Sequence, residues 1–208
     1  MGDNNIYIVN SYTNTFPGKM IRLRASMKFW NRYDGDEYSH VSLSRDNKLN
    51  NMFSFARKEI NNPFNSGLIR ESIYEKMFIL NPTKSKIAVI KLPVTKTQYD
   101  SIEEIMNYYW SIRDDLGFNF VGLASMLFCA RGVESKNNYF CSQWVATVLK
   151  EAGVEIFDNK EPYNIRPFDF YCTLKEHIIY EGLTINYDSN KIVEENSKVL
   201  VKHFNNKI

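Results

Sequence analysis

Cys141 is the residue whose type and position most clearly suggest chemistry, because it begins a predicted helix that runs from residue 141 to residue 152. At a helix N-terminus, unpaired backbone N–H groups and the positive end of the helix dipole favour a thiolate and could hold an oxyanion. After the cysteine, apolar residues recur at helical spacing: Trp144, Val145, Val148, Leu149 and Ala152. Because Cys141 lies on this apolar stripe, a small buried core residue is the alternative interpretation.

A cysteine nucleophile needs a general base within hydrogen-bond reach, and the chain contains three histidines. His177 lies in a charged segment and His203 lies in a polar C-terminal stretch, so we expect both of them at the surface. His40 is the histidine in a patterned segment, which makes it the candidate base for Cys141.

The segment around His40, residues 38–44, alternates polar and apolar side chains and therefore predicts a strand. Val41 and Leu43 form its apolar face, whereas His40 shares the other face with small polar residues such as Ser42. A histidine buried only for packing would belong with Val41 and Leu43. We therefore expect His40 to point into a polar environment, for instance a cleft.

The bulk composition limits the function classes. The chain has 208 residues, with 44% hydrophobic and 24% charged residues, which is typical of a soluble globular protein, whereas 14% aromatic residues is on the high side. Its net charge of +2 provides no overall field for nucleic acid or an anionic membrane, and we expect no nucleic-acid partner. Three cysteines without CxxC spacing predict neither a disulfide framework nor a zinc site. We expect no metal and no cofactor.

Localisation is predicted from the absence of targeting signals. The first residues lack the basic and apolar regions of a signal peptide, and the apolar runs are too short to cross a bilayer. We therefore expect a cytoplasmic protein without a transmembrane segment. The bias toward Asn, Lys and Ile is typical of an AT-rich genome, such as that of a bacterium, phage or virus.

The remaining elements follow from hydrophobic periodicity and turn residues. Strands are expected at residues 6–9, 52–57, 86–92 and 178–187. A basic helix is expected at residues 19–30, and a helix that follows a capping box is expected at residues 96–113. A helix buried in the core is expected at residues 118–130, and another is expected to begin at Pro167. Residues 61–67 are expected to form a loop, and residues 68–77 fit either a helix or a strand. Together these elements predict an α+β fold.

Two motifs in this order resemble a known family. Tyr38-Ser39-His40-Val41-Ser42-Leu43-Ser44, followed by Met52-Phe53-Ser54-Phe55-Ala56-Arg57, precedes Tyr139-Phe140-Cys141-Ser142-Gln143-Trp144 and then Pro167-Phe168-Asp169-Phe170. The arrangement is similar to the circularly permuted papain-like amidases, in the permuted branch of the NlpC/P60 superfamily. In that branch the histidine strand comes before the cysteine helix, as it does here. The resemblance covers roughly residues 6–172.

The resemblance implies one permuted papain-like domain over residues 1–208, with a core of about 6–187 and a C-terminal tail of 188–208. Its fold would be an antiparallel sheet or partial barrel packed against helices. Cys141 would be the nucleophile, with its backbone N–H in the oxyanion hole, and His40 would be the general base. Family members place a polar orienting residue on the following strand, where Ser54 stands here. Because serine carries no charge, Glu59 or Asn61 could take that role, or the pair could act as a dyad.

The activity implied is that of a cysteine-dependent hydrolase, an amidase or peptidase that forms a thioester acyl-enzyme. Its substrate would be a peptide, an amide or an acyl lipid. An acyltransferase or thioesterase acting on lipid acyl groups is the first alternative. A catalytically inactive binding module of the same fold, acting through the basic segment 19–32, is the second.

Overall fold

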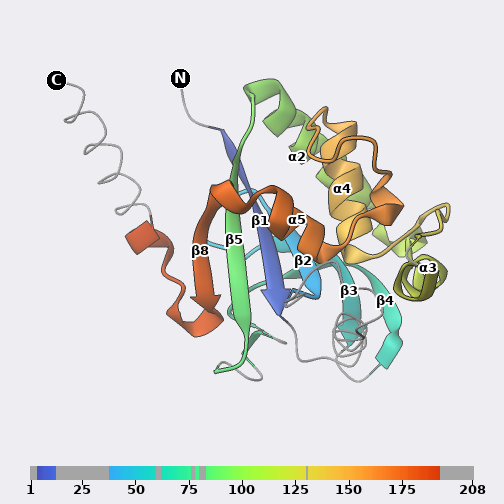
Figure 1. Cartoon of the computed structure of the whole chain (residues 1–208), viewed down its shortest axis with the longest axis horizontal. Helices are drawn as coiled ribbons and strands as arrows, with labels where there is room; N and C mark the ends of the chain where they lie inside the picture. The colour runs from blue at the N-terminus through green and yellow to red at the C-terminus, as the bar shows by residue number, and fades with distance from the viewer. Residues whose placement is uncertain are drawn as a thin grey trace.

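The computed structural model describes residues 4–12, 38–59, 62–75, 78–79, 83–129 and 131–192 (Figure 1). The predicted basic helix at 19–30 and His203 lie outside these ranges. In the described ranges, five strands come first, then helices and further strands, and the strands of the main sheet pair in antiparallel fashion. The structure is therefore a mixed α+β fold with an antiparallel sheet packed against helices, as expected.

Among the described residues, six strands form the main sheet, in the order β4-β3-β2-β1-β5-β8. Their bounds are β1 (Asn5–Tyr12), β2 (His40–Ser44), β3 (Met52–Glu59), β4 (Asn62–Glu71), β5 (Lys86–Pro93) and β8 (Ile178–Leu183). The alternating segment around His40 is thus a central strand, between β1 and β3. The predictions of strands at residues 52–57 and 86–92 are also confirmed.

Strand β4 corrects one expectation. Residues 62–67 were predicted to be a loop because of Pro63, but they form the first part of a strand that continues to Glu71. A proline is compatible with this strand because β4 lies at the edge of the sheet, where backbone N–H groups need no ladder partner. The ambiguous segment that begins at residue 68 is therefore strand as far as Glu71.

Alternation along the strands builds one core on each face of the sheet. On one face, β1, β2 and β3 contribute Ile8, Leu43 and Phe53 to a core that also contains residues of α2 and α4. On the other face, Val9 and Met52 join a second core. Because both faces are covered, even the polar residues of the central strand β2 are buried.

The helices in the described ranges are α2 (Lys96–Ser111), α3 (Phe120–Cys129), α4 (Cys141–Glu151) and α5 (Pro167–Thr173). Thr95 and Gln98 form the predicted capping box of α2, and Pro167 opens α5 as expected. Figure 1 shows α2 and α4 side by side on one side of the sheet, and α4 packs against β2 and β3. Two short strands, β6 (Gly117–Phe118) and β7 (Asn138–Tyr139), pair in parallel before α3 and α4.

Helix α3 differs from the prediction of a helix buried in the core. It begins at Phe120 because Asn119 caps it, with the Asn119 side chain accepting a hydrogen bond from Gly122 N at 2.7 Å. Phe120 is 43% exposed and Val121 is 69% exposed, so one side of the helix faces solvent. The apolar composition of α3 therefore does not reflect complete burial.

Candidate active site

His40 is the first residue of β2 and is almost completely buried. Its backbone pairs with Ser11 on β1. The ring nitrogen Nε2 lies 2.9 Å from Glu71 Oε1, a buried hydrogen bond that is also an ion pair when His40 is protonated. The polar face of β2 therefore contacts a buried carboxylate. On the side of Nε2, His40 does not point into the expected cleft.

Glu71 is the site residue that the sequence analysis missed. It ends β4 opposite Met52, and its carboxylate reaches past β3 to β2, where Ser42 Oγ also donates a hydrogen bond to Oε1. The sequence carried one usable signal: if residues 68–71 are read as a strand paired with β3, Glu71 falls on the same face as Ser54. Glu71 supplies the negative charge that Ser54 could not.

Ser54 lies where expected, on β3, but its contribution is mainly its small size. It is completely buried, and Glu71 extends beside it from β4 toward β2. Ser54 Oγ helps to lower the pKa of Glu71, although its geometry falls outside that of a regular hydrogen bond. A larger side chain at residue 54 would occupy the space that the Glu71 carboxylate needs.

Cys141 begins α4, as predicted, and its side chain is partly exposed. The residue before it, Phe140, occupies the N-cap position without a side-chain hydrogen bond to the helix. The first intrahelical bond runs from Trp144 N to Phe140 O at 3.0 Å, so the N–H groups of residues 141–143 have no partner within the helix. An apolar N-cap thus leaves these donors beside the sulfur uncapped.

The structure brings His40 and Cys141 together. Burial alone would lower the pKa of His40, but the negative charge of Glu71 and hydrogen bonds with Cys141 and Glu71 outweigh it and raise that pKa from 6.5 to about 10. Since Nε2 hydrogen-bonds to Glu71, Nδ1 is the ring nitrogen that remains for a second partner. A protonated imidazole beside a cysteine stabilises the nucleophilic thiolate form.

The pKa of Glu71 shifts in the opposite direction. Burial alone would raise it, but the positive charge of His40 and hydrogen bonds from His40, Ser42 and Ser54 lower it. The carboxylate is therefore ionised at neutral pH and faces a protonated imidazole. His40 of β2 thus interacts with Glu71 of β4 and with Cys141 at the N-terminus of α4.

The two residues after Cys141 anchor the start of α4. Ser142 Oγ donates a 2.6 Å hydrogen bond to the backbone carbonyl of Ile165, and both residues are completely buried. Gln143 Oε1 accepts a 3.1 Å hydrogen bond from Asn119, the cap of α3. The Gln143 side chain therefore links the start of α4 to the start of α3. These bonds hold the N-terminus of α4 in position beside His40.

Other candidate residues lie outside this cluster. Glu59 is exposed at the end of β3 and accepts a hydrogen bond from Asn65 at 3.1 Å, while Asn61 lies outside the described residues. His177 is in a short 3-10 helix before β8 and is partly exposed. Cys172 is exposed on α5. Neither Glu59 nor His177 forms a hydrogen bond or ion pair with His40 in the described part of the chain.

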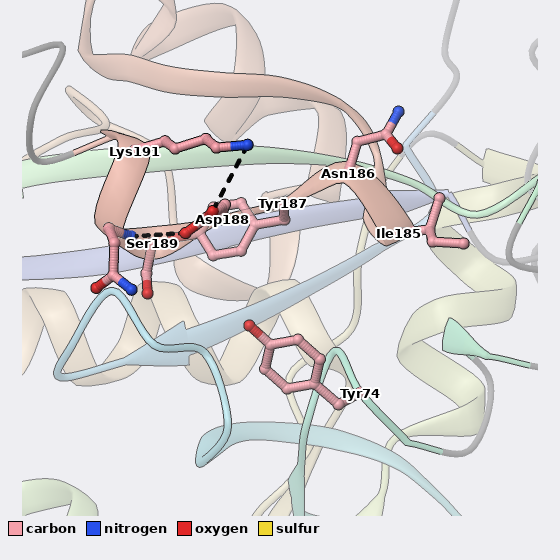
Figure 2. Close-up of a pocket in the computed structure, with 8 residues that line it drawn as sticks. Tyr74, Ile185, Asn186, Tyr187, Asp188, Ser189 and Lys191 are labelled. Carbon is pink, nitrogen blue, oxygen red and sulfur yellow. Dashed lines mark hydrogen bonds and ion pairs between the residues drawn. The ribbon is translucent and has the colours of Figure 1, made fainter.

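A surface hollow lies elsewhere on the molecule, as Figure 2 shows. It has a volume of about 640 Å³ and is lined by Tyr74 and by residues 185–191. Lys191 and Asp188 form an ion pair of 3.8 Å in its wall. Because its lining includes neither His40 nor Cys141, this hollow does not belong to the cluster.

Two kinds of feature are absent from the described residues. Within these ranges, no group of three or more His, Cys, Asp or Glu side chains is arranged to hold a metal ion. Among the helices that the structure describes, none combines the length and apolarity needed to cross a bilayer.

Comparisons with protein-family models, with curated proteins and with solved structures give no match to this chain. The features that bear on function are therefore the geometry around Cys141, His40 and Glu71 and the motif resemblance.

Proposed function

We propose that this protein is a cysteine-dependent hydrolase of the amidase or peptidase type, with a circularly permuted papain-like fold. The observation that carries the proposal is that His40 hydrogen-bonds to Glu71 and that Cys141 is among the neighbours that raise the pKa of His40. A nucleophile, a base and a group that orients the base are the parts that acyl transfer through a thioester requires. The order of the histidine strand and cysteine helix supports the permuted arrangement.

In the first half-reaction, the Cys141 thiolate attacks the substrate carbonyl carbon and a C–S bond forms. The oxyanion lies against the uncapped N–H groups at the start of α4. The intermediate then collapses, the bond to the leaving group breaks, and His40 transfers its proton to the departing nitrogen. A thioester with Cys141 and a free amine result, with His40 now neutral.

In the second half-reaction, neutral His40 takes a proton from water as the water oxygen attacks the thioester carbon. The C–S bond breaks, the acid product leaves, and Cys141 and His40 return to the thiolate and imidazolium. Glu71 remains an acceptor for Nε2 throughout, so the ring keeps Nδ1 directed at the sulfur. With an alcohol or amine as the acceptor, the same steps give the alternative acyltransferase.

The proposal predicts that iodoacetamide alkylates Cys141 faster than Cys172 near neutral pH. Exposure alone predicts the opposite order, since Cys172 is exposed and Cys141 is only partly so. Faster reaction at the less accessible thiol therefore reports activation by His40. Peptide mapping by mass spectrometry after short labelling times gives both rates in one sample. His40→Ala should slow Cys141 by about 100-fold or more and leave Cys172 unchanged.

A p-nitrophenyl ester then tests acyl transfer itself. We expect an initial burst of p-nitrophenol and an acyl group on Cys141, both lost in Cys141→Ala and retained in the control Cys172→Ala. Slow labelling of Cys141, equal to that of an unactivated thiol, together with no burst, would instead identify the inactive binding module.

Ser54 provides a separate prediction about size. Ser54→Ala should change the alkylation rate of Cys141 by less than about threefold, because Ser54 makes no regular hydrogen bond. Ser54→Leu should slow it strongly, because the added volume displaces the Glu71 carboxylate from His40. Alkylation kinetics on folded proteins, verified by circular dichroism, check both. A large loss in Ser54→Ala would show that the hydroxyl itself is needed.

A further inference from the structure

Ser42 is a buried polar residue that the proposed mechanism does not use. It lies two residues after His40 on β2 and is completely buried. Its hydroxyl donates a hydrogen bond to Glu71 Oε1, the same oxygen that His40 Nε2 contacts. The distance from Ser42 Oγ to His40 Nε2 is 3.4 Å, so the three polar groups are in mutual contact.

The two oxygens of Glu71 are engaged very differently. Oε1 meets both His40 and Ser42, whereas Oε2 is buried and has no hydrogen-bond partner among the described residues. Since Oε2 provides no anchor, the orientation of the carboxylate depends on the two donors at Oε1. Of these, Ser42 is the neutral one, so its bond persists when His40 gives up its proton.

We propose that Ser42 is a positioning residue whose hydroxyl holds Glu71 Oε1 against His40 Nε2, and so keeps the imidazole directed at Cys141. The inference depends on the proposed function for its catalytic meaning, but its structural part stands on the contacts alone. Serine suits this place because its side chain is small and flexible enough to donate from the neighbouring residue on the same face of the strand. Alanine at residue 42 would leave His40 as the one group with a regular hydrogen bond to the carboxylate among the described residues.

The charged and titratable groups that face this cluster come from three elements. His40 belongs to β2, Glu71 to β4 and the Cys141 thiol to α4, while β3 contributes the uncharged Ser54. No other titratable side chain in the described ranges is a cause of the shifts at His40 or Glu71. A change in the titration of His40 in a Ser42 variant therefore reports this cluster.

Ser42→Ala tests the inference, with Ser44→Ala as the matched control. Ser44 lies on the same strand and face, is equally buried, and donates its hydrogen bond to Asp46 O at 2.8 Å, outside the cluster. The titration of His40 is followed by NMR of its ring C–H signals, assigned by their loss in His40→Gln. Ser42→Ala should lower the His40 midpoint by about one pH unit and slow alkylation of Cys141 near neutral pH by about tenfold.

An unchanged His40 midpoint in folded Ser42→Ala would overturn the inference, because a residue that only packs leaves the titration alone. A raised midpoint would also overturn it, by showing that the hydroxyl competes with His40 for Oε1. The two proposals can also separate. If Ser42→Ala lowers the His40 midpoint but Cys141 of the wild-type protein is unreactive, the positioning role of Ser42 is supported and the proposed function is refuted. If Ser42→Ala does not fold, the NMR titration is carried out on Ser42→Cys, whose side chain has a similar volume but is a weaker hydrogen-bond donor.

Discussion

Exchange of Glu71 for glutamine is expected to lower the pKa of His40 from about 10 to 6.5 or below. The charge of Glu71 is the largest of the contributions that overcome the effect of burial on His40, and glutamine keeps the shape and an acceptor oxygen without that charge. At about pH 8.5 the variant imidazole would be only about 1% protonated, whereas the wild type would remain mostly protonated. Alkylation of Cys141 should then slow by about 10- to 100-fold.

NMR titration of His40 and the pH dependence of alkylation measure this effect directly. Glu103→Gln is the matched control, since it removes the same charge from a partly exposed ion pair between α2 and Arg45. The control should leave the His40 midpoint in place. A midpoint near 10 in Glu71→Gln would show that Glu71 is not the partner that keeps His40 protonated.

The same pair makes stability depend on pH, and the sign follows from the direction of each shift. His40 has a raised pKa, so its stabilising contribution is full below 6.5 and is lost as the pH rises through about 10. Glu71 has a lowered pKa, so its contribution is full above 4.5 and is lost at more acidic pH. Urea denaturation should show wild-type stability falling between about pH 6.5 and 10, with a flatter curve in Glu71→Gln.

Trp144→Ala is expected to cost about 3–5 kcal/mol of unfolding free energy, the largest stability effect that we predict. Trp144 is completely buried on α4, and its ring packs against Phe55 of β3 and Tyr109 of α2, each with ring centroids at 6.2 Å. Its removal leaves a cavity at the junction of the sheet and both helices. The fall should appear as a lower urea midpoint with an unchanged slope.

Trp144→Phe is the control for this cavity. The indole Nε1 is buried without a hydrogen-bond partner among the described residues, so phenylalanine removes an unsatisfied donor while keeping much of the volume. We expect it to cost less than about 1.5 kcal/mol. Equal losses in both variants would show that the indole contributes more than packing.

Local patterns were sufficient for most of the elements that carry the site. Alternation identified the His40 strand, and helical spacing with an N-terminal cysteine identified α4. Both signals are read over a few residues, because strand and helix periods act on neighbouring side chains. The capping box before α2 and the proline that opens α5 were found for the same reason.

Edge position and burial explain two predictions that were wrong. Pro63 suggested a loop, but an edge strand tolerates proline, and the sequence does not state which strand lies at an edge. The apolar run in α3 suggested a buried helix, but Phe120 and Val121 remain exposed. In both cases the deciding quantity is the neighbour in space, which local composition does not contain.

By itself, the sequence determined that Cys141 begins a helix and that His40 lies on a polar strand face. Only the tertiary structure decided that Glu71 is their partner, because Glu71 belongs to β4 and reaches β2 past a strand that lies between them. That contact depends on the antiparallel register of β3 with β4, in which Met52 pairs with Glu71. Strand register is set by long-range pairing and by the burial of whole faces, and these forces act only once the sheet has formed.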